Sequence, residues 1–507
     1  MNTLNRRSFV SAGAASALAL GTYINPLSAA ARQATPQSDL DPSALNDLRT
    51  RLNGTLMLPG DSGYAAASAP ANGRYLDILP AAVARCADET DVVTCIQWCN
   101  ENEVSPVGRG GGHSYAGFST TTGLMIDIRR LNSMAVDTRE GIVTCGGAAL
   151  NNDFFIATED GPLFLPGGTC LGVGMGGLTL GGGIGYNAHW ADLTCDHLQA
   201  SRIVTAAGEV LDIDGSTNSD LYWACRGGAG GNFGINTSFT FDLVEVPQDG
   251  ITYYRFEWTG ADAAFATLAA FDTLIQTAPA AFNGVIMAEA TEVGAGGPSE
   301  AINIMSRGQY IGPLDELQDL VAPLLEAATP DTQTVEAKTF WDMQRMIASG
   351  EPDPHSFGDL SRYSNRLLPE SVTAELGDLL VSCPSRSADA NGSIWSLGWV
   401  GGDVIGRFSR TETAYVHRDA TTLLRPTTVW PNDAPESVGN ELNAWTDAVI
   451  AAIAPHTPDE SYQNFPNRAI ENWQQQYYAE NFERLVDVKT AHDPGNLFNN
   501  PQSIPVR

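Results

Sequence analysis

Glycine is concentrated in three loops in the first half of the chain, and this limits how the chain can fold more than any other feature. The loops run from Gly108 to Gly117, from Gly167 to Gly185 and from Arg226 to Gly234. Glycine allows positive φ and lets backbone N–H groups approach a ligand without a Cβ in the way. Any single loop could be a structural turn. Three in one region predict a cradle for an anionic group such as a pyrophosphate.

The charge balance limits which partners the chain can have. Asp and Glu outnumber Lys and Arg by 59 to 28, which gives a formal net charge of −31. No nucleic acid partner is expected, because phosphate backbones are bound mainly through Lys and Arg. The only lysines are Lys338 and Lys489. Neither follows a glycine loop, so a Walker-type nucleotide loop is excluded.

A dinucleotide-binding fingerprint is formally present in the second loop. It reads Gly183-Ile-Gly-Tyr-Asn-Ala188, with Glu209 about twenty residues further on. In such folds the acidic residue ends a second parallel strand. Here Ala207-Gly208 predicts a hairpin turn beside Glu209, so we expect a different phosphate cradle.

The first 31 residues are typical of an export signal. Arg6-Arg7 precedes an apolar run of small residues from Ser11 to Leu20, and Ala29-Ala-Ala31 offers a cleavage site. The alternative is a transmembrane helix, which needs about 20 strongly apolar residues. This run is instead rich in Ala, Gly and Ser. The sequence therefore predicts twin-arginine export to the periplasm or the extracellular space, without stable membrane insertion.

Hydrophobic spacing in the first half predicts mixed α and β structure. A strand at 81–85, a helix at 91–102 and a strand at 104–108 precede the first glycine loop. A hairpin is expected at 201–213, with its turn at Ala207-Gly208.

The pattern changes beyond Pro247, which indicates a second domain. Longer strands at 253–258 and 302–310 alternate with helices at 261–277 and 314–328. This alternation favours an antiparallel sheet backed by helices. The chain ends in an aromatic stretch in which 473–489 is predicted to be helical.

Two reactive side chains lie inside the glycine loops. His113 stands in the first loop and Cys170 in the second, each close to several glycines. A lone His or Cys is more often structural, but glycine on both sides places these two against a ligand. No third ligand accompanies them, so no metal site is expected. Such a pair suits covalent attachment to an electrophilic cofactor, and most of the other cysteines are expected to be buried thiols.

Four motifs in order resemble the berberine-bridge-enzyme-like FAD oxidases of the vanillyl-alcohol-oxidase fold. They are Gly110-Gly-Gly-His-Ser-Tyr-Ala-Gly117, Gly168-Thr-Cys-Leu-Gly-Val-Gly-Met-Gly-Gly177, Arg226 to Gly234, and Tyr477 to Pro505. The resemblance covers the chain from about residue 45 to its end. It implies a two-domain α+β flavoprotein, with an FAD-binding domain and an α/β substrate domain built on a large antiparallel sheet.

The resemblance also implies how the cofactor is held. FAD would be bicovalent, with His113 bonded to the C8 methyl of the flavin and Cys170 to C6. The FAD-binding domain would be discontinuous, formed by 45–247 and 461–507, with the substrate domain at 248–460. The matching positions imply further cofactor-binding residues: Arg109, Gly110, Gly111, Gly112, Ser114, Gly117, Val173, Gly174, Gly176, Gly177, Gly234 and Asn464.

The catalytic base is an open question at this point. Carbohydrate oxidases of the family carry a Tyr-x-Asn-Tyr motif whose second tyrosine is the base, and here the motif reads Tyr462-Gln-Asn-Phe465. Phenylalanine cannot accept a proton. The candidates are Tyr462, Tyr115, which matches a tyrosine that lines the site in those oxidases, a residue of the second domain, or none.

A second departure lies in the strand 393–399, where relatives often place a carboxylate that faces the flavin. Alternate residues share a face of a strand, and neither face of this strand holds an acid. Trp395 and Trp399 offer aromatic surface instead, unless they are core residues. This favours a flat or apolar substrate, although tryptophan also stacks on sugars.

The resemblance implies a secreted oxidase that acts on a small molecule. A C–H next to a hydroxyl or amine would give hydride to FAD, and molecular oxygen would reoxidise the flavin to give hydrogen peroxide. Val173 is small, and in relatives a small residue there accompanies oxidase behaviour. The substrate would be an aromatic or secondary metabolite or an oligosaccharide. The alternatives are a flavin dehydrogenase with another acceptor, or a non-catalytic flavin- or metabolite-binding protein.

Overall fold

The computed structural model describes residues 40–248, 250–348, 355–387, 389–401 and 405–507. The predicted export signal therefore lies outside the described residues. Within those ranges, no helix combines the length and the apolar character needed to cross a membrane.

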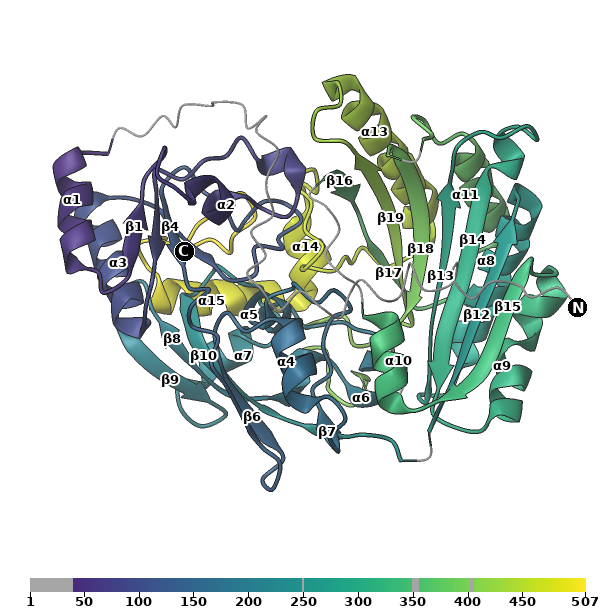
Figure 1. The fold of residues 1–507 in the computed structure, drawn as a ribbon, viewed down its shortest axis with the longest axis horizontal. Coiled ribbons are helices and arrows are strands. Elements are labelled where there is room, and N and C mark those ends of the chain that lie inside the picture. The colour runs from purple at the N-terminus through teal and green to yellow at the C-terminus, as the bar shows by residue number, and fades with distance from the viewer. Residues whose placement is uncertain (1–39, 249, 349–354, 388, 402–404) are drawn as a thin grey trace, which may run out of the picture.

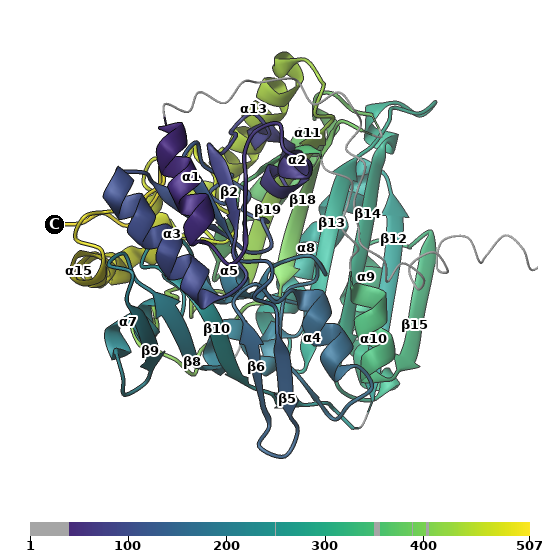
Figure 2. The ribbon, with the colours of Figure 1, turned by 60° about the vertical axis from the view of Figure 1, so that its left-hand side comes forward.

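The first part of the molecule contains a small sheet flanked by helices (Figure 1). Its order is β1-β2-β4-β3, with β2 and β3 both parallel to β4. The strands are β1 (Thr55–Met57), β2 (Ala82–Arg85), β3 (Pro106–Arg109) and β4 (Leu124–Asp127). Helix α3 (Glu89–Asn102) links β2 to β3, and Asp88 caps its N-terminus by accepting a hydrogen bond from the Asp91 N–H. Figure 2 shows α1 (Pro42–Arg51) beside α3.

A second, antiparallel sheet follows in the order β5-β6-β10-β8-β9. Its strands are β5 (Met134–Asp137), β6 (Ile142–Gly146), β8 (Leu198–Val204), β9 (Val210–Asp214) and β10 (Ile235–Asp242). The predicted hairpin is confirmed, since β8 and β9 pair with Val204 opposite Val210. Glu209 lies in the turn of this hairpin, so the dinucleotide fingerprint has no structural basis here.

Short elements connect these sheets. They are α2 (Tyr64–Ser68), α4 (Asn151–Thr158), β7 (Leu163–Phe164), α5 (Met175–Leu180), α6 (Ala188–Ala191), α7 (Ser219–Ala224) and β11 (Val244–Glu245).

The middle of the chain forms one large sheet of eight strands, all paired antiparallel. The order is β15-β12-β14-β13-β18-β19-β16, and β17 also pairs with β19. The strands are β12 (Ile251–Thr259), β13 (Phe282–Ala290), β14 (Ile302–Tyr310), β15 (Thr332–Lys338), β16 (Ser356–Asp359), β17 (Arg362–Ser364), β18 (Asn391–Gly398) and β19 (Thr422–Trp430). The predicted antiparallel sheet is confirmed.

Helices cover one face of the large sheet (Figure 1). They are α8 (Ala261–Thr277), α9 (Leu314–Ala327), α11 (Glu370–Val381) and α13 (Glu436–Ile453). Phe256, Ile286 and Ile394 point to this face and join one hydrophobic core with the helices. The alternate residues point the other way, where Tyr115 and Tyr186 of the first part meet Arg425 and Trp399. Helix α10 (Phe340–Ile347) is not part of this layer of helices.

The C-terminal segment returns to the first part of the molecule, drawn in yellow beside blue in Figure 1. The prediction that 473–489 is helical is confirmed, but the helix is interrupted. The chain forms α14 (Trp473–Tyr478), a short turn at Ala479–Asn481 and α15 (Phe482–His492). Ala479 has a φ of 41°, which interrupts the helix. Residues Leu485 and Val488 of α15 share a hydrophobic core with Phe239 of β10.

Candidate active site

The first and second glycine loops touch each other. A Cβ on Gly111 would lie 2.4 Å from the Gly174 nitrogen, and a Cβ on Gly174 would lie 2.7 Å from the Gly111 nitrogen. Both positions therefore require glycine. His113 follows Gly111 by two residues and Cys170 precedes Gly174 by four, so this contact draws the two nucleophiles into one region.

Open space remains beside both loops. Nothing lies closer than 4.0 Å to a Cβ built on Gly110, and nothing lies within 4 Å of one built on Gly177. The backbone is thus accessible at these two positions, which is the geometry that a phosphate group needs. The two loops therefore fit a cofactor that contains a pyrophosphate.

Other predicted cofactor residues make close contacts with protein. The Ser114 hydroxyl accepts a hydrogen bond from the Phe118 N–H at 3.0 Å. The buried Arg109 guanidinium donates to the Ala69 and Ser119 carbonyl groups, which braces the first loop. A Cβ would come within 3 Å of a protein atom at Gly112, Gly117, Gly176 and Gly234. Contacts of these residues with the cofactor stay predictions.

The third glycine loop packs between the second loop and the C-terminal segment. A Cβ on Gly227 would lie 2.1 Å from the Tyr415 nitrogen, and one on Gly228 would lie 2.8 Å from Leu485. The Leu180 carbonyl, within the second loop, accepts hydrogen bonds from the Gly227 and Ala229 N–H groups. At these positions the glycines serve close packing of protein on protein.

Tyr115 lies in an aromatic and cationic cluster. The Tyr115 ring stacks on Phe465 at 5.0 Å between centroids, with 9° between the ring planes. Arg425 Nη2 donates to the Tyr115 hydroxyl at 3.2 Å, and the guanidinium lies 4.6 Å from the Phe465 centroid. Burial raises the pKa of Tyr115, and the Arg425 charge opposes that rise. Cys170 also acts electrostatically on this phenol, so the cluster adjoins the predicted flavin attachment site.

A buried carboxylate beside this cluster was not found from the sequence. Asp359 of β16 accepts hydrogen bonds at Oδ2 from Arg425 Nε (2.6 Å) and Thr427 Oγ1 (2.8 Å). Its other oxygen, Oδ1, is buried without a hydrogen-bond partner among the described residues. Burial raises the pKa of Asp359 to about 6, although Arg425 and Thr427 lower it. Only the pairing of β16 with β19 places Asp359 here, and that pairing joins residues 68 positions apart.

A second carboxylate lies on the other side of the strand 393–399. Glu289 of β13 pairs with Ser393 of β18, and burial raises its pKa. The strand itself lacks an acid, as the sequence indicates. Glu289 and Asp359 come instead from the other strands β13 and β16 of the same sheet.

The raised pKa of Asp359 predicts how stability depends on pH. A carboxyl group that titrates near 6 when folded and near 4 when unfolded stabilises the fold below pH 4, and this contribution is lost as pH rises through 6. From pH 4 to 7, wild type should lose about 2 kcal/mol more stability than Asp359→Asn. Urea unfolding of both proteins at four pH values measures this difference. Parallel curves would contradict it.

Tyr462, the other candidate base, is almost completely buried. Its hydroxyl oxygen accepts hydrogen bonds from the Gly183 and Ile184 N–H groups and from Asn464 Nδ2, each at 3.1 Å. Burial raises the pKa of Tyr462 to about 12, and the three donors oppose the rise. Three donors on one phenol oxygen favour negative charge there. Tyr462 and Tyr115 both contact the Phe465 ring, Tyr462 at 4.9 Å, so the two candidates lie in one cluster.

Asn464 is held in place from two sides. Asn464 Nδ2 donates to the Leu178 carbonyl of α5 at 2.9 Å as well as to Tyr462. A Cβ on Gly181 would lie 2.1 Å from Asn464 Oδ1. Asn464 therefore fixes Tyr462 against the second loop. Its predicted contact with the cofactor is not tested by these distances.

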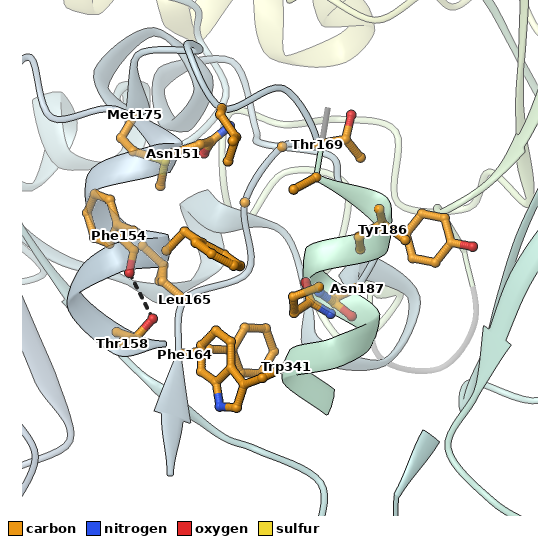
Figure 3. A pocket seen from close by; sticks show the side chains of 17 residues that line it. Asn151, Phe154, Thr158, Phe164, Leu165, Thr169, Met175, Tyr186, Asn187 and Trp341 are labelled. Carbon is orange, nitrogen blue, oxygen red and sulfur yellow. Dashed lines mark hydrogen bonds between the residues drawn. The ribbon is translucent and has the colours of Figure 1, made fainter. Parts of the chain in front are cut away.

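A cavity of about 70 Å³ lies between α4 and α10, next to the loop that carries Cys170 (Figure 3). Aromatic side chains form much of its wall, namely Phe154, Phe164 and Trp341. Thr169, next to Cys170, also lines it. Val173 is half-buried nearby, and its N–H donates to the Cys170 carbonyl at 3.3 Å.

The predicted chemical state of the other cysteines is confirmed. Cys86, Cys95, Cys99, Cys145, Cys195, Cys225 and Cys383 are buried free thiols.

Comparison with known proteins gives consistent results over most of the chain. The FAD binding domain family matches residues 80–214, and the berberine and berberine-like family matches residues 461–505. A Bacillus subtilis (strain 168) protein described as uncharacterized FAD-linked oxidoreductase YgaK is 30% identical over 465 residues, which is 90% of this chain and 98% of that protein. Glucooligosaccharide oxidase of Sarocladium strictum is 28% identical over 451 residues, 85% of this chain and 88% of the relative.

Solved structures share the fold. Wild-type Physcomitrella patens BBE-like 1 superposes with a TM-score of 0.80 at 23% identity, over 91% of this chain and 99% of that one. Berberine bridge enzyme from Eschscholzia californica gives 0.78 at 21% identity, over 92% and 99%. The predicted vanillyl-alcohol-oxidase-type α+β fold is confirmed. With glycine loops that fit the cofactor and relatives that match over nearly their full length, the chain belongs to the berberine bridge enzyme-like family of FAD-linked oxidoreductases.

Proposed function

We propose that this protein is an exported FAD oxidase that holds its flavin through two covalent bonds and passes electrons to molecular oxygen. The observation that carries the proposal is the contact between Gly111 and Gly174, which draws His113 and Cys170 into one glycine-lined region. A solved relative, the glucooligosaccharide oxidase from Acremonium strictum, is described as having a 6-S-cysteinyl, 8α-N1-histidyl FAD. That description supports the same two linkages here.

The chain's own residues divide the remaining work between them. When bound, FAD would accept a hydride from the substrate carbon. Tyr462 or Tyr115 takes the proton from the adjacent hydroxyl or amine. Tyr462 is suited to this by its three N–H donors, and Tyr115 by the Arg425 guanidinium. Both phenols contact Phe465, so two proton acceptors remain where the second tyrosine of the motif is missing.

The FAD-binding domain is assigned to residues 45–247 and 461–507, and the substrate domain to 248–460. This division is supported by the core that α15 shares with the sheet of β6, β8 and β10. The large sheet spans residues 251–430 and has its own core with α8, α9, α11 and α13.

The substrate is a small molecule with a ring that stacks on tryptophan. Trp395 and Trp399 are half-buried and Trp395 lies in the sheet that faces the glycine loops. Both an aromatic metabolite and an oligosaccharide offer such a ring, and relatives are named for glucooligosaccharides and xylooligosaccharides. Export through the twin-arginine pathway would deliver the folded, flavin-loaded protein to the periplasm or beyond.

Oxygen use is tested at Val173. Adding a methylene by Val173→Ile should crowd the space where oxygen reaches the flavin. Reoxidation should slow about tenfold or more, which corresponds to a rise of about 1.4 kcal/mol in its activation free energy. Stopped-flow mixing of photoreduced protein with air-saturated buffer measures this rate and needs no known substrate.

Val136→Ile is the matched control, since Val136 is half-buried against the same core but lies in β5. Its reoxidation rate should equal that of wild type. If unmodified protein reoxidises slowly and Val173→Ile does not change the rate, the protein is a dehydrogenase that uses another acceptor.

A further inference from the structure

Arg307 of β14 is a half-buried cation without a partner. Its Nε is buried, and among the residues that the structure describes no acceptor forms a hydrogen bond or an ion pair with the guanidinium. Arg255 lies directly opposite on β12, but it is paired with Glu257 at 2.5 Å. Like charges at opposed positions repel, and burying an unpaired charge is costly. A site that keeps Arg307 in this state is suited to an anion.

Two further buried donors near Arg307 also lack partners. Tyr186 Oη and Trp399 Nε1 form no hydrogen bond with a described residue, and their rings lie 5.7 Å apart. Burial raises the pKa of Tyr186, and Arg307 is the strongest opposing group, so the guanidinium is close to that phenol.

The strand register brings Trp399 to the same place. Arg307 pairs with Val285, and Val285 pairs with Leu397, so these three side chains share the face that the helices leave uncovered. Trp399 follows Leu397 by two residues, directly after β18 ends at Gly398. A guanidinium, a phenol hydroxyl and an indole N–H therefore converge, and Arg307 Nε, Tyr186 Oη and Trp399 Nε1 form no hydrogen bond with a described residue.

Unpaired polar atoms continue around the neighbouring residue, Asn187. Its amide is held by Gln344 at 3.0 Å and by Gln309 at 2.7 Å. The remaining polar atoms of these two partners, Gln344 Nε2 and Gln309 Oε1, are buried without hydrogen bonds in the described part of the chain. Native proteins leave few buried polar atoms unpaired. A local group of five indicates a place for a polar ligand or ordered water.

This cluster adjoins the glycine loop that carries Cys170. Tyr186 follows Gly185, and a Cβ on Gly185 would lie 1.7 Å from the Gly167 carbonyl at the start of that loop. Tyr186 and Asn187 also line the cavity beside Thr169 (Figure 3), where the Tyr186 ring points away from the aromatic wall. A ligand anchored at Arg307 would therefore extend toward the predicted flavin.

We propose that Arg307, the Tyr186 hydroxyl and the Trp399 indole N–H bind the carboxylate of the substrate, which makes the substrate an organic acid with a flat, apolar body. This inference rests on the proposed function for the reaction of the substrate, but the binding of the substrate does not depend on it. Arginine holds a carboxylate through paired hydrogen bonds, and the ring faces of Trp395 and Trp399 provide the apolar surface.

Calorimetric titration of the flavin-loaded protein tests the anion site. The probes are benzoate, phenylacetate and 3-phenylpropionate, each compared with its neutral amide. At least one acid should bind about tenfold or more tightly than its amide, because only the acid satisfies the guanidinium. Arg307→Gln should remove that preference, and Arg255→Gln, which changes the paired arginine, should keep it. Failure of all three acids to bind, or a preference that survives Arg307→Gln, overturns the proposal.

A stability measurement tests the site without any ligand. If Arg307 is reserved for a ligand, Arg307→Met should leave the Tm unchanged or raise it, because an unpaired buried charge is removed. A fall of several degrees would mean that Arg307 supports the fold, and the proposal would be wrong. Binding is measured without turnover, so an acid that binds but is never oxidised contradicts the proposed function and leaves the carboxylate site standing.

Discussion

The double variant His113→Ala, Cys170→Ala is expected to lose all of its flavin on acid denaturation. Each single variant should keep the flavin attached through the remaining bond. The reason is that the two side chains lie in two different loops that meet at Gly111 and Gly174, so either bond alone joins the ring to the chain. Precipitation with acid, followed by the absorbance of the pellet and the supernatant near 450 nm, measures the attached fraction.

Controls separate attachment from general damage. Cys225→Ala removes a buried thiol, and His492→Ala removes an imidazole that is paired with Asp220 at 2.8 Å. Both variants should retain covalent flavin. Yellow colour that stays with the polypeptide of the double variant would show that another residue forms a bond to the cofactor.

Lys489→Met is expected to destabilise the protein by about 3–5 kcal/mol, because it leaves a buried charge without its partner. The Lys489 ammonium group is completely buried and donates to Asp493 Oδ2 at 2.6 Å, to the Phe498 carbonyl at 2.6 Å and to the Asn232 carbonyl at 2.8 Å. Asn232 belongs to the third glycine loop. Flavin loading should therefore fall together with stability if residues 461–507 complete the FAD-binding domain.

The other lysine of the chain is the matched control. Lys338 lies at the edge strand β15 and pairs with Glu336 at 3.0 Å near the surface. Such exposed pairs contribute about 0–1 kcal/mol, so Lys338→Met should be nearly neutral. Urea unfolding and the ratio of flavin to protein absorbance give both quantities. Equal effects of the two substitutions, or normal flavin loading in Lys489→Met, would contradict the role given to the C-terminal segment.

Local signals in the sequence predict the first and last residues of some helices and strands. The helix at 261–277 and the strand at 302–310 have the predicted bounds, because each has clear hydrophobic periodicity. The break at Ala479 could not be foreseen in this way. Alanine favours helices, and the positive φ of Ala479 lies between two helices that pack into one hydrophobic core with residues far away in the sequence.

The residues of the candidate site can also be divided into those with a local sequence signal and those without one. His113, Cys170 and Tyr115 are recognisable because each lies within or beside a glycine-rich motif. Asp359 and Arg307 lie in no such motif. Each becomes part of the site only because its strand pairs with particular neighbouring strands. Sheet register joins residues that are far apart in the chain, and sequence periodicity does not specify which strands are neighbours.

The large sheet should tolerate substitutions and insertions differently as such proteins diverge. Side chains alternate between the helix-packed face and the face toward the glycine loops, so exchanging every second residue of β13, β14, β18 or β19 alters the substrate surface and leaves the core shared with the helices intact. One inserted residue in any of these strands would exchange the two faces from that point on. New specificities should therefore arise by substitution within the strands, and differences in length should be confined to the connecting loops.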